Sequence, residues 1–385
     1  MDFLFVLASV LLITVLIVVH EFGHFLAAKF YGFQTPVFGI GLPFGPGIDL
    51  FKKWGTQFKF YFALIGGFVA IPELGDETDD EMLKKYKVEK PLREFPVYQR
   101  AVVASGGIVF NILFGFLIAV VMAATIGLPK SVPSNSIAAF TSTESIAKKA
   151  GLISGDKITS VNGIEVKTGE ELKSTIQQLA NQEVQLKISR PVYEEVTGKK
   201  KASKKVVSYE DLDLKVFSPG ALGIVLGQDK VYEHYGMNPI KWIWNALIFT
   251  GKTIGVMFVS IIALLIALIQ KVLVIIIPGM QVASVDLGEV KGIVGIVQII
   301  SEDIRSNAFL LLEFAYLLSL NLAVINVLPI PALDGGHLAF MAYEGIAGKK
   351  PAEKFQEISI QIGFAFLLTL ILITTFNDIK NWIFQ

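Results

Sequence analysis

Two histidines and a glutamate end an uninterrupted apolar run near the start of the chain, in the sequence VLIVVHEFGHFLAAKF of residues 15–30. Ionisable side chains at membrane depth are costly, so their default interpretation is functional. In the pattern H-E-x-x-H, residues four apart share a helix face, and His20 and His24 can therefore bind one metal ion. Glu21 then lies beside the metal, where it can take a proton from a metal-bound water. The alternative is a set of polar residues that only caps a membrane helix.

Composition places this motif in an integral membrane protein that carries some soluble mass. Hydrophobic residues make up 53% of the 385 residues and charged residues only 18%, below the quarter or so that is usual in soluble proteins. The formal net charge is zero, so the lipid bilayer is an expected partner and nucleic acid is not. The chain has no cysteine, and any zinc site must therefore use His, Asp or Glu.

Four apolar stretches are predicted to be core transmembrane helices: residues 3–28, 99–127, 308–330 and 357–376. The first resembles a signal peptide in length but lacks a basic start and a small-residue cleavage site, so we expect a retained helix with its N-terminus outside. Ten Lys and Arg residues lie between Lys29 and Arg100. The positive-inside rule makes that loop cytoplasmic, which places HEFGH near the inner end of the first helix.

The first half of this loop, residues 36–72, is rich in Gly, Pro and aromatic residues. It is too broken for a spanning helix and predicts β-hairpins or re-entrant strands, a membrane-associated β-loop that must pack on protein or line a wet cavity. An interfacial loop without a substrate role is the alternative. In the second helix, Gly106 and Gly107 permit close helix approach, and Asn111 either joins two helices or serves the site.

A soluble segment follows at residues 132–230 and alternates strand, turn and helix signals, as expected of a small α+β domain. Its phrase AGLISGDKITSVNG closely resembles the PDZ family in the permuted form found in bacterial proteases. PDZ domains bind an extended peptide as an added strand. Leu222, Gly223 and Ile224 loosely match the loop that holds a C-terminal carboxylate in that family. The lysine run from Lys199 to Lys205 is expected to be a solvated hairpin tip.

Residues 239–278 are hydrophobic for about forty residues but are interrupted by lysines. They are too long for one span and predict either two helices or interfacial amphipathic helices followed by a buried piece, while residues 279–305 give no clear pattern. The expected domains are the N-terminal membrane half 1–128, the extracytoplasmic PDZ domain 129–232, the linker helices 233–305 and the C-terminal membrane half 306–385.

A catalytic zinc has three protein ligands and an open position for water, so His20 and His24 need a third partner. The candidates are Asp334, His337, His234 and nearby acidic residues. Asp334 lies in a turn rich in Gly and Pro at a membrane helix end, where an unpaired carboxylate needs a reason to exist. His337 follows three residues later and could instead hydrogen-bond nearby, while His234 is expected at the outer surface.

Membrane sidedness tests the choice of Asp334. With the N-terminus outside, the first helix ends inside, and the second returns the chain to the outside, where the soluble domain lies. Helix 308–330 must then run from outside to inside for Asp334 to reach the histidines. Residues 239–278 must therefore cross the membrane an even number of times, zero or two, and a single crossing would remove the third ligand.

Together these motifs resemble the site-2 protease family, most closely its bacterial regulator-of-sigma-E branch. The resemblance rests on HEFGH in the first membrane helix, the spacing from Gly107 to Asn111 in the second, the PDZ insertion, and NVLPIPALDG near the C-terminus. It covers nearly the whole chain, and the paired HExxH and LDG motifs are specific. Two features depart from the family: a single PDZ domain where the best-known members have two, and an unusually hydrophobic 239–278 segment.

The resemblance implies an intramembrane zinc metalloprotease that cleaves within the transmembrane segments of single-pass proteins, such as anti-sigma factors or remnant signal peptides. It implies one zinc ion held by His20, His24 and Asp334, with Glu21 as the catalytic base. It also links the motif containing Asn326, Pro329 and Pro331 to substrate handling and likens residues 60–71 to the family's β-loop. The residues expected to contact substrate are Asn111, Asn326, Pro329, Gly66, Gly67 and Gly223.

The expected location is the bacterial inner membrane, with the zinc site toward the cytoplasm and the PDZ domain outside. Two other classes compete with the protease. A membrane scaffold would use the PDZ domain alone and would not need Glu21. A metal transporter is disfavoured because its ligands should follow a path across the membrane, whereas here they cluster at one end.

Overall fold

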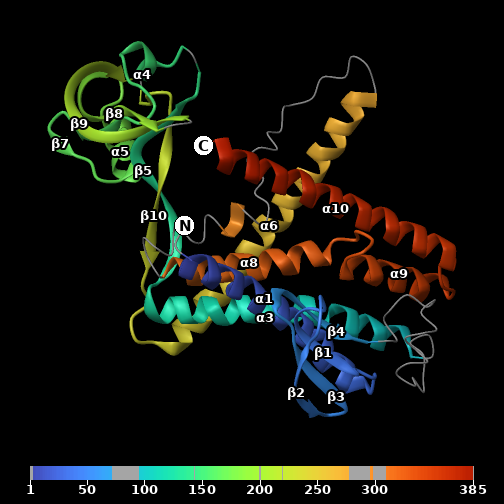
Figure 1. Ribbon diagram of the computed structural model, residues 1–385. Coiled ribbons are helices and arrows are strands. Elements are labelled where there is room, and N and C mark those ends of the chain that lie inside the picture. The colour runs from blue at the N-terminus through green and yellow to red at the C-terminus, as the bar shows by residue number, and fades with distance from the viewer. Residues whose placement is uncertain are drawn as a thin grey trace. The chain divides into compact units, whose positions relative to one another are not determined.

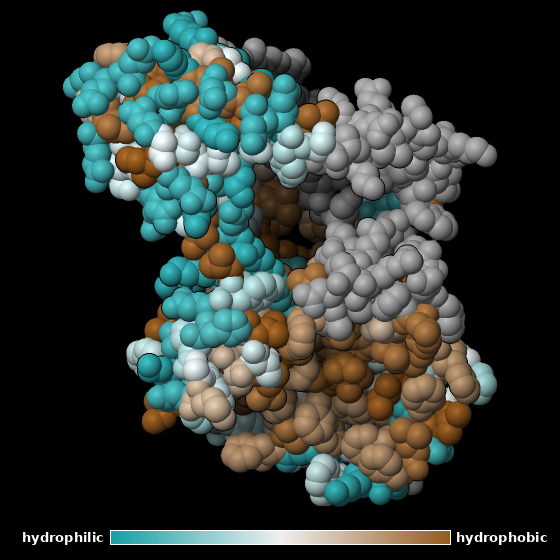
Figure 2. Space-filling model, turned by 90° about the vertical axis from the view of Figure 1, so that its left-hand side faces the viewer, coloured by the Kyte–Doolittle hydropathy of each residue, from teal (hydrophilic) through white to brown (hydrophobic). Residues whose placement is uncertain are grey.

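A computed structural model of the chain describes residues 3–71, 95–142, 144–198, 201–218, 220–276, 295–297 and 309–384. It divides into two compact units, one formed by Met1–Ile126 with Tyr235–Asn381 and the other built around Gly127–His234. Figure 2 shows hydrophobic side chains gathered on the surface of the helical unit and hydrophilic side chains covering the other unit.

Among its described residues, the first unit has five helices long and apolar enough to cross a membrane, as expected of a multi-pass membrane protein. They are α1 (Phe3–Tyr31), α3 (Val97–Thr125), α6 (Pro239–Ile276), α8 (Leu310–Val327) and α10 (Glu353–Phe384). Four of them match the predicted core helices in place. Helix α10 is longer than predicted, because no Gly or Pro ends it and the polar tail NDIKNW continues the helix.

The fifth helix, α6, differs from the sequence-based expectation. Residues 239–276 form one continuous helix of 38 residues, which excludes two helices within this range. No proline interrupts it after Pro239, and Gly251 and Gly255 stand where nothing lies near them, so the helical hydrogen bonds continue past them. The first turns of α6 pack on α3 and α8, while most of its length is exposed.

Residues 37–70 form a four-stranded sheet beside α1, with strand order β2-β3-β1-β4. The strands are β1 (Val37–Leu42), β2 (Ile48–Lys53), β3 (Thr56–Phe60) and β4 (Ala63–Ala70). β2 and β3 make a hairpin at Trp54 and Gly55, both of positive φ, whereas β1 pairs parallel to β3 and antiparallel to β4. α1 packs on β4, the edge strand, and the Thr14 hydroxyl donates to the Leu64 carbonyl there.

Helices α1 and α3 lie side by side (Figure 1), and they meet at two glycines. A Cβ atom at Gly23 would lie 2.2 Å from the carbonyl oxygen of Gly106, and one at Gly106 would lie 2.6 Å from that of Gly23. Only glycine permits this approach, which is the small-residue packing common between membrane helices. The close approach brings the histidine face of α1 against α3.

The second unit is a small α+β fold with strand order β10-β5-β6-β8-β9, and β7 pairs with β6. Its elements are β5 (Leu128–Phe140), α4 (Ile146–Lys149), β6 (Lys157–Val161), β7 (Ile164–Glu165), α5 (Gly169–Gln178), β8 (Gln182–Gly198), β9 (Lys201–Ser218) and β10 (Ile224–Glu233). Buried Ile, Leu and Val residues from the strands and α5 form its core. Asp156, fully buried, accepts two hydrogen bonds from Arg190 and one from the Ile153 amide, which fixes the G-D turn before β6.

Candidate metal centre

His20 and His24 lie one turn apart on the face of α1 that is covered by α3, and both are more than 90% buried. Gly107 of α3 makes room for them. A Cβ atom at Gly107 would lie 2.5 Å from His20 Cε1 and 2.5 Å from His24 Nε2. The glycine therefore has a direct physical role, since any larger residue there would occupy the space of the imidazole rings.

Asp334 is the first residue of α9 (Asp334–Ala347), which follows α8 after a short turn. Two glycines let this turn fold tightly. Cβ atoms at Gly335 and Gly336 would lie 2.1 Å and 2.5 Å from the carbonyl oxygens of Leu328 and Ile330. The DGG sequence thus seats the start of α9 directly against the end of α8.

A buried ion pair attaches the other end of α9 to α3. Arg100 Nη2 donates to Glu344 Oε1 at 2.6 Å, and both side chains are largely buried. Arg100 Nε also donates to the Phe95 carbonyl at 3.1 Å. Because one partner lies near the start of α3 and the other on α9, the pair fixes the helix that carries Asp334 relative to the helix that covers the histidines.

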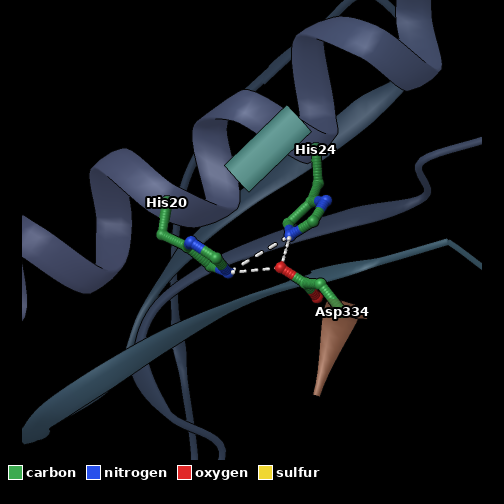
Figure 3. A group of neighbouring side chains, drawn as sticks. All are labelled: His20, His24 and Asp334. Atoms are coloured by element: carbon green, nitrogen blue, oxygen red, sulfur yellow. Dashed lines mark hydrogen bonds and ion pairs between the residues drawn. The ribbon is translucent and has the colours of Figure 1, made fainter. Parts of the chain in front are cut away.

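The three side chains converge on one point (Figure 3). Asp334 Oδ2 lies 3.2 Å from His20 Nε2 and 3.4 Å from His24 Nε2, and the two imidazole nitrogens are 3.2 Å apart. Zinc–ligand distances of about 2.0–2.1 Å and tetrahedral angles require ligand atoms to be about 3.3 Å apart. The three separations therefore fit a tetrahedral zinc ion with one open position, and within the described residues this is the group of His, Asp and Glu that could hold a metal.

Electrostatics favour an ionised carboxylate at this position. Burial raises the pKa of Asp334, but its hydrogen bonds and charge interactions with His20 and His24 outweigh burial, and the pKa lies below its ordinary value. An ionised carboxylate and neutral imidazoles are the forms that bind zinc.

Contacts behind the ligand atoms orient the histidine rings. His24 Nδ1 lies 2.8 Å from the Val103 carbonyl oxygen, so its N–H donates to that oxygen and leaves Nε2 with a free lone pair. His20 Nδ1 lies 3.0 Å from the side-chain nitrogen of Asn111, a fully buried residue of α3. Both contacts come from α3.

Glu21 follows His20 directly and is half-buried. Its Oε2 accepts a hydrogen bond of 3.1 Å from the Val69 amide of β4. The carboxylate therefore lies between the histidine pair and the edge strand of the sheet. A carboxylate so placed can accept a proton from a water molecule on the adjacent metal and can also contact a peptide lying along β4.

The remaining sequence-predicted residues are distributed around and away from this centre. Asn326 is buried near the end of α8, Pro329 is exposed in the turn before α9, and His337 lies in α9 outside the three-residue group. His234 is exposed in the second unit, where Gly223 also lies, with φ of +70°. In the β-loop, Gly66 has φ of +129°. A Cβ atom added to Gly67 would lie 3.2 Å from Val18 Cγ2.

Sequence reasoning missed three contributors to the centre: the Val69 amide, the Val103 carbonyl and the Arg100–Glu344 pair. Backbone groups leave no mark on residue identity, so no sequence signal could have revealed the first two. Arg100 did offer a signal, because a charged residue at the start of a membrane helix requires a partner when it is buried.

Comparison with known proteins gives consistent matches along almost the whole chain. The family model described as "Peptidase family M50" matches residues 8–370. The chain is 32% identical over 366 residues to "Membrane metalloprotease ARASP, chloroplastic" of Arabidopsis thaliana, with 92% of this chain and 74% of that protein covered. It is 27% identical to "Zinc metalloprotease RasP" of Shouchella clausii, with 97% and 98% covered.

Proposed function

Because this chain belongs to peptidase family M50 and is a zinc metalloprotease, we propose that it hydrolyses peptide bonds within the transmembrane segments of single-pass membrane proteins. The observation that carries the proposal is the position of the metal centre. Both histidines lie on α1, a helix long and apolar enough to span a membrane, and the centre is buried against a second such helix, α3. Anti-sigma factors and remnant signal peptides are the proposed substrate types.

In this proposal His20, His24 and Asp334 hold the zinc ion, and Glu21 is the catalytic base. When bound, zinc polarises the scissile carbonyl and acidifies the attacking water. The Glu21 carboxylate takes the proton of that water and later passes it to the leaving amine. The 3.1 Å hydrogen bond from Val69 holds Glu21 in place for both transfers.

The substrate must be unwound, because a helix hides its carbonyl groups in its own hydrogen bonds. We propose that β4 holds the unwound segment as an added strand. Two observations support this: β4 is at an edge of its sheet, and its Val69 amide points away from β1 toward Glu21. By alternation Gly67 presents its backbone to the same side.

Proline at Gly67 tests strand addition, since proline lacks the N–H group that a paired substrate would need. Gly67→Pro should lower cleavage about fivefold while zinc content stays at that of the wild type, because one backbone hydrogen bond of about 1 kcal/mol is lost. The matched control is Gly67→Ala, which adds the same Cβ atom but keeps the amide. Equal cleavage by both variants would reject strand addition at β4.

The central test compares wild-type protein with Glu21→Gln on a purified single-pass substrate. Loss of a general base lowers rates by about 10²–10⁴-fold, and zinc content should be unchanged because Glu21 is not a ligand. Glu353→Gln, the same change at an exposed position of α10, is the control. Wild-type cleavage by Glu21→Gln would refute the mechanism and would favour a membrane scaffold, which needs no base.

We propose the bacterial inner membrane as the location, with the metal centre toward the cytoplasm and the second unit outside. The ten Lys and Arg residues between Lys29 and Arg100 support this orientation. Since the chain has no cysteine, single cysteines report sidedness cleanly. A membrane-impermeant maleimide should label Ser131→Cys in spheroplasts and Gly345→Cys only after permeabilisation, and the reverse pattern would invert the topology.

We propose that the second unit is a PDZ domain that contacts the substrate through the Leu222–Ile224 loop. Gly223 supports this assignment for two reasons: its φ is positive, and a Cβ atom added to it would lie 2.9 Å from Ser145 Cβ. Both favour glycine at this position. We also propose that Asn326 and Pro329 contact the substrate, since they belong to α8 and the turn that leads into Asp334. Substitutions at these positions should raise KM more than they lower kcat.

A further inference from the structure

Asn111 is fully buried, and only one of the two polar atoms of its side-chain amide has a hydrogen-bond partner among the described residues. Its Nδ2 lies 3.0 Å from His20 Nδ1, while its Oδ1 is buried without a hydrogen-bond partner among the described residues. A buried carbonyl oxygen without a partner costs about 1–3 kcal/mol. An arrangement that leaves this oxygen alone beside an imidazole therefore requires an explanation.

The chemistry of the imidazole ring decides which end of the amide belongs at His20. If Nδ2 donates to Nδ1, the ring proton lies on Nε2, the atom that faces Asp334 and His24. An Nε2 that carries a proton has no lone pair for a metal. A half-turn of the carboxamide exchanges its oxygen and nitrogen with almost no change of shape. Oδ1 then accepts the proton on Nδ1, and Nε2 is free to bind.

We propose that Asn111 is a positioning residue for His20: in the zinc-loaded enzyme its Oδ1 accepts the Nδ1–H of His20 and so fixes the tautomer and the ring direction. The proposal rests on the assignment of His20 as a zinc ligand. It differs from a role for Asn111 in substrate contact, because the interaction is made with the protein's own imidazole and exists before substrate arrives.

α3 then orients both imidazoles of α1. The Val103 carbonyl accepts from His24 and the Asn111 carboxamide accepts from His20, two turns further along the same helix. The Asn111 backbone is itself fixed, since the Ser319 hydroxyl of α8 donates to its carbonyl oxygen at 2.8 Å. Because α8 leads directly to Asp334, the helices α1, α3 and α8 together hold all three proposed ligands in position relative to one another.

Zinc affinity, measured by competition with a chelator of known affinity, tests the proposal. Loss of such an outer contact weakens metal binding by about 10–100-fold. Asn111→Leu is nearly isosteric but has no acceptor, and it should show this loss. Asn111→Asp keeps an acceptor oxygen, and it should bind zinc within about threefold of wild type or more tightly.

Two further variants keep the outcome interpretable. Asn111→Ala removes the acceptor without adding an apolar branch, and it should weaken zinc binding to the same degree if Asn111→Leu fails to fold. Asn245→Leu makes the same change on α6, outside the three-residue group, and should leave zinc affinity unchanged. Kinetics of cleavage at saturating zinc give kcat and KM for each variant.

Wild-type zinc affinity in both Asn111→Leu and Asn111→Ala would overturn the proposal. A fall in kcat without a change in zinc affinity would also overturn it and would assign Asn111 to the substrate instead. Because zinc affinity is measured without substrate, this result is independent of whether Glu21 is the base. A failure of the proposed proteolytic mechanism would therefore be distinguishable from a failure of the Asn111 proposal.

Discussion

Gly107→Ala should inactivate the enzyme by displacing the two histidines proposed as zinc ligands while leaving the fold intact. Gly107 lies in α3 directly opposite the histidine pair. A Cβ atom at this position would stand 2.5 Å from His20 Cε1, 2.5 Å from His24 Nε2 and 2.6 Å from His20 Nδ1. The surrounding α3 backbone is helical, so alanine causes no backbone strain, and the conflict is confined to the two rings.

The size of the effect follows from these distances. Ordinary van der Waals contact requires at least 3.4 Å, so each ring must move by about 1 Å, whereas metal–ligand distances tolerate only about 0.2 Å. A misplacement of about 1 Å at a reacting centre costs about 100-fold. We therefore expect zinc affinity to fall at least about 100-fold, or about 2.8 kcal/mol, with a matching loss of cleavage.

The assay is chelator competition for zinc together with cleavage of a single-pass substrate. Gly251→Ala is the matched control, because Gly251 is also helical but no atom lies within 4 Å of its added Cβ. It should be neutral or stabilising by up to about 1 kcal/mol, since alanine favours helix over glycine. Zinc affinity in Gly107→Ala within threefold of wild type would refute the assignment of these rings as ligands.

Three further predictions concern the rest of the molecule. Asp156→Ala leaves the partly exposed Arg190 and the Ile153 amide without their buried acceptor, so strands of the second unit should lose about 1–3 kcal/mol of protection in hydrogen–deuterium exchange; a loss below 1 kcal/mol would contradict the importance of this pair. Arg100→Gln strands the carboxylate of Glu344 between α3 and α9, and should lower the melting temperature more than the Arg100→Gln, Glu344→Gln double variant does. Zinc removal with phenanthroline should abolish cleavage reversibly without changing the far-ultraviolet circular dichroism, because the ligands lie on helices formed independently of the metal.

The three candidate metal ligands could be chosen from the sequence because they are residues that a membrane helix carries only at a cost. His20 and His24 stand four apart, and Asp334 directly follows a Pro-rich stretch at the end of an apolar run, where the sequence offers the carboxylate no evident partner. The structure brings these three together. The same reasoning placed four core helices, since 20 apolar residues leave a helix few alternatives.

The sequence could not predict which backbone groups contact the site, or that residues 239–276 form one continuous helix. The contacts of Val69 and Val103 use main-chain atoms, which every residue type provides, so their partners depend only on how β4 and α3 pack. The single helix α6 was missed because the lysines and length of residues 239–276 suggested a break, whereas an exposed lysine does not interrupt helical hydrogen bonds and its long side chain can reach a polar surface.

Helix α6 also bears on how the chain reaches Asp334. The end of α1 and the start of α3 are adjacent, as the contact of Tyr31 with Tyr98 shows. Asp334 follows the end of α8 and lies beside the histidines near the end of α1, so α8 runs in the same direction as α1 and opposite to α3. If all three helices span the membrane, α8 must therefore begin on the side where α3 ends. The chain between α3 and α8 then crosses the membrane an even number of times. Of this chain, the structure describes the long apolar helix α6, whose geometry bears on the count.

The packing of α6 favours no crossing by this helix. Tyr316 of α8 stacks on Phe249 and donates to the Thr253 hydroxyl at 2.8 Å. Tyr316 is about 9 Å along α8 from Leu310, whereas Thr253 is about 21 Å along α6 from Pro239, at 1.5 Å per residue. Two helices that entered the membrane at one level and ran along its normal would meet at equal depth. α6 therefore lies oblique to α8, as Figure 1 also shows, which suits a helix that follows the membrane surface.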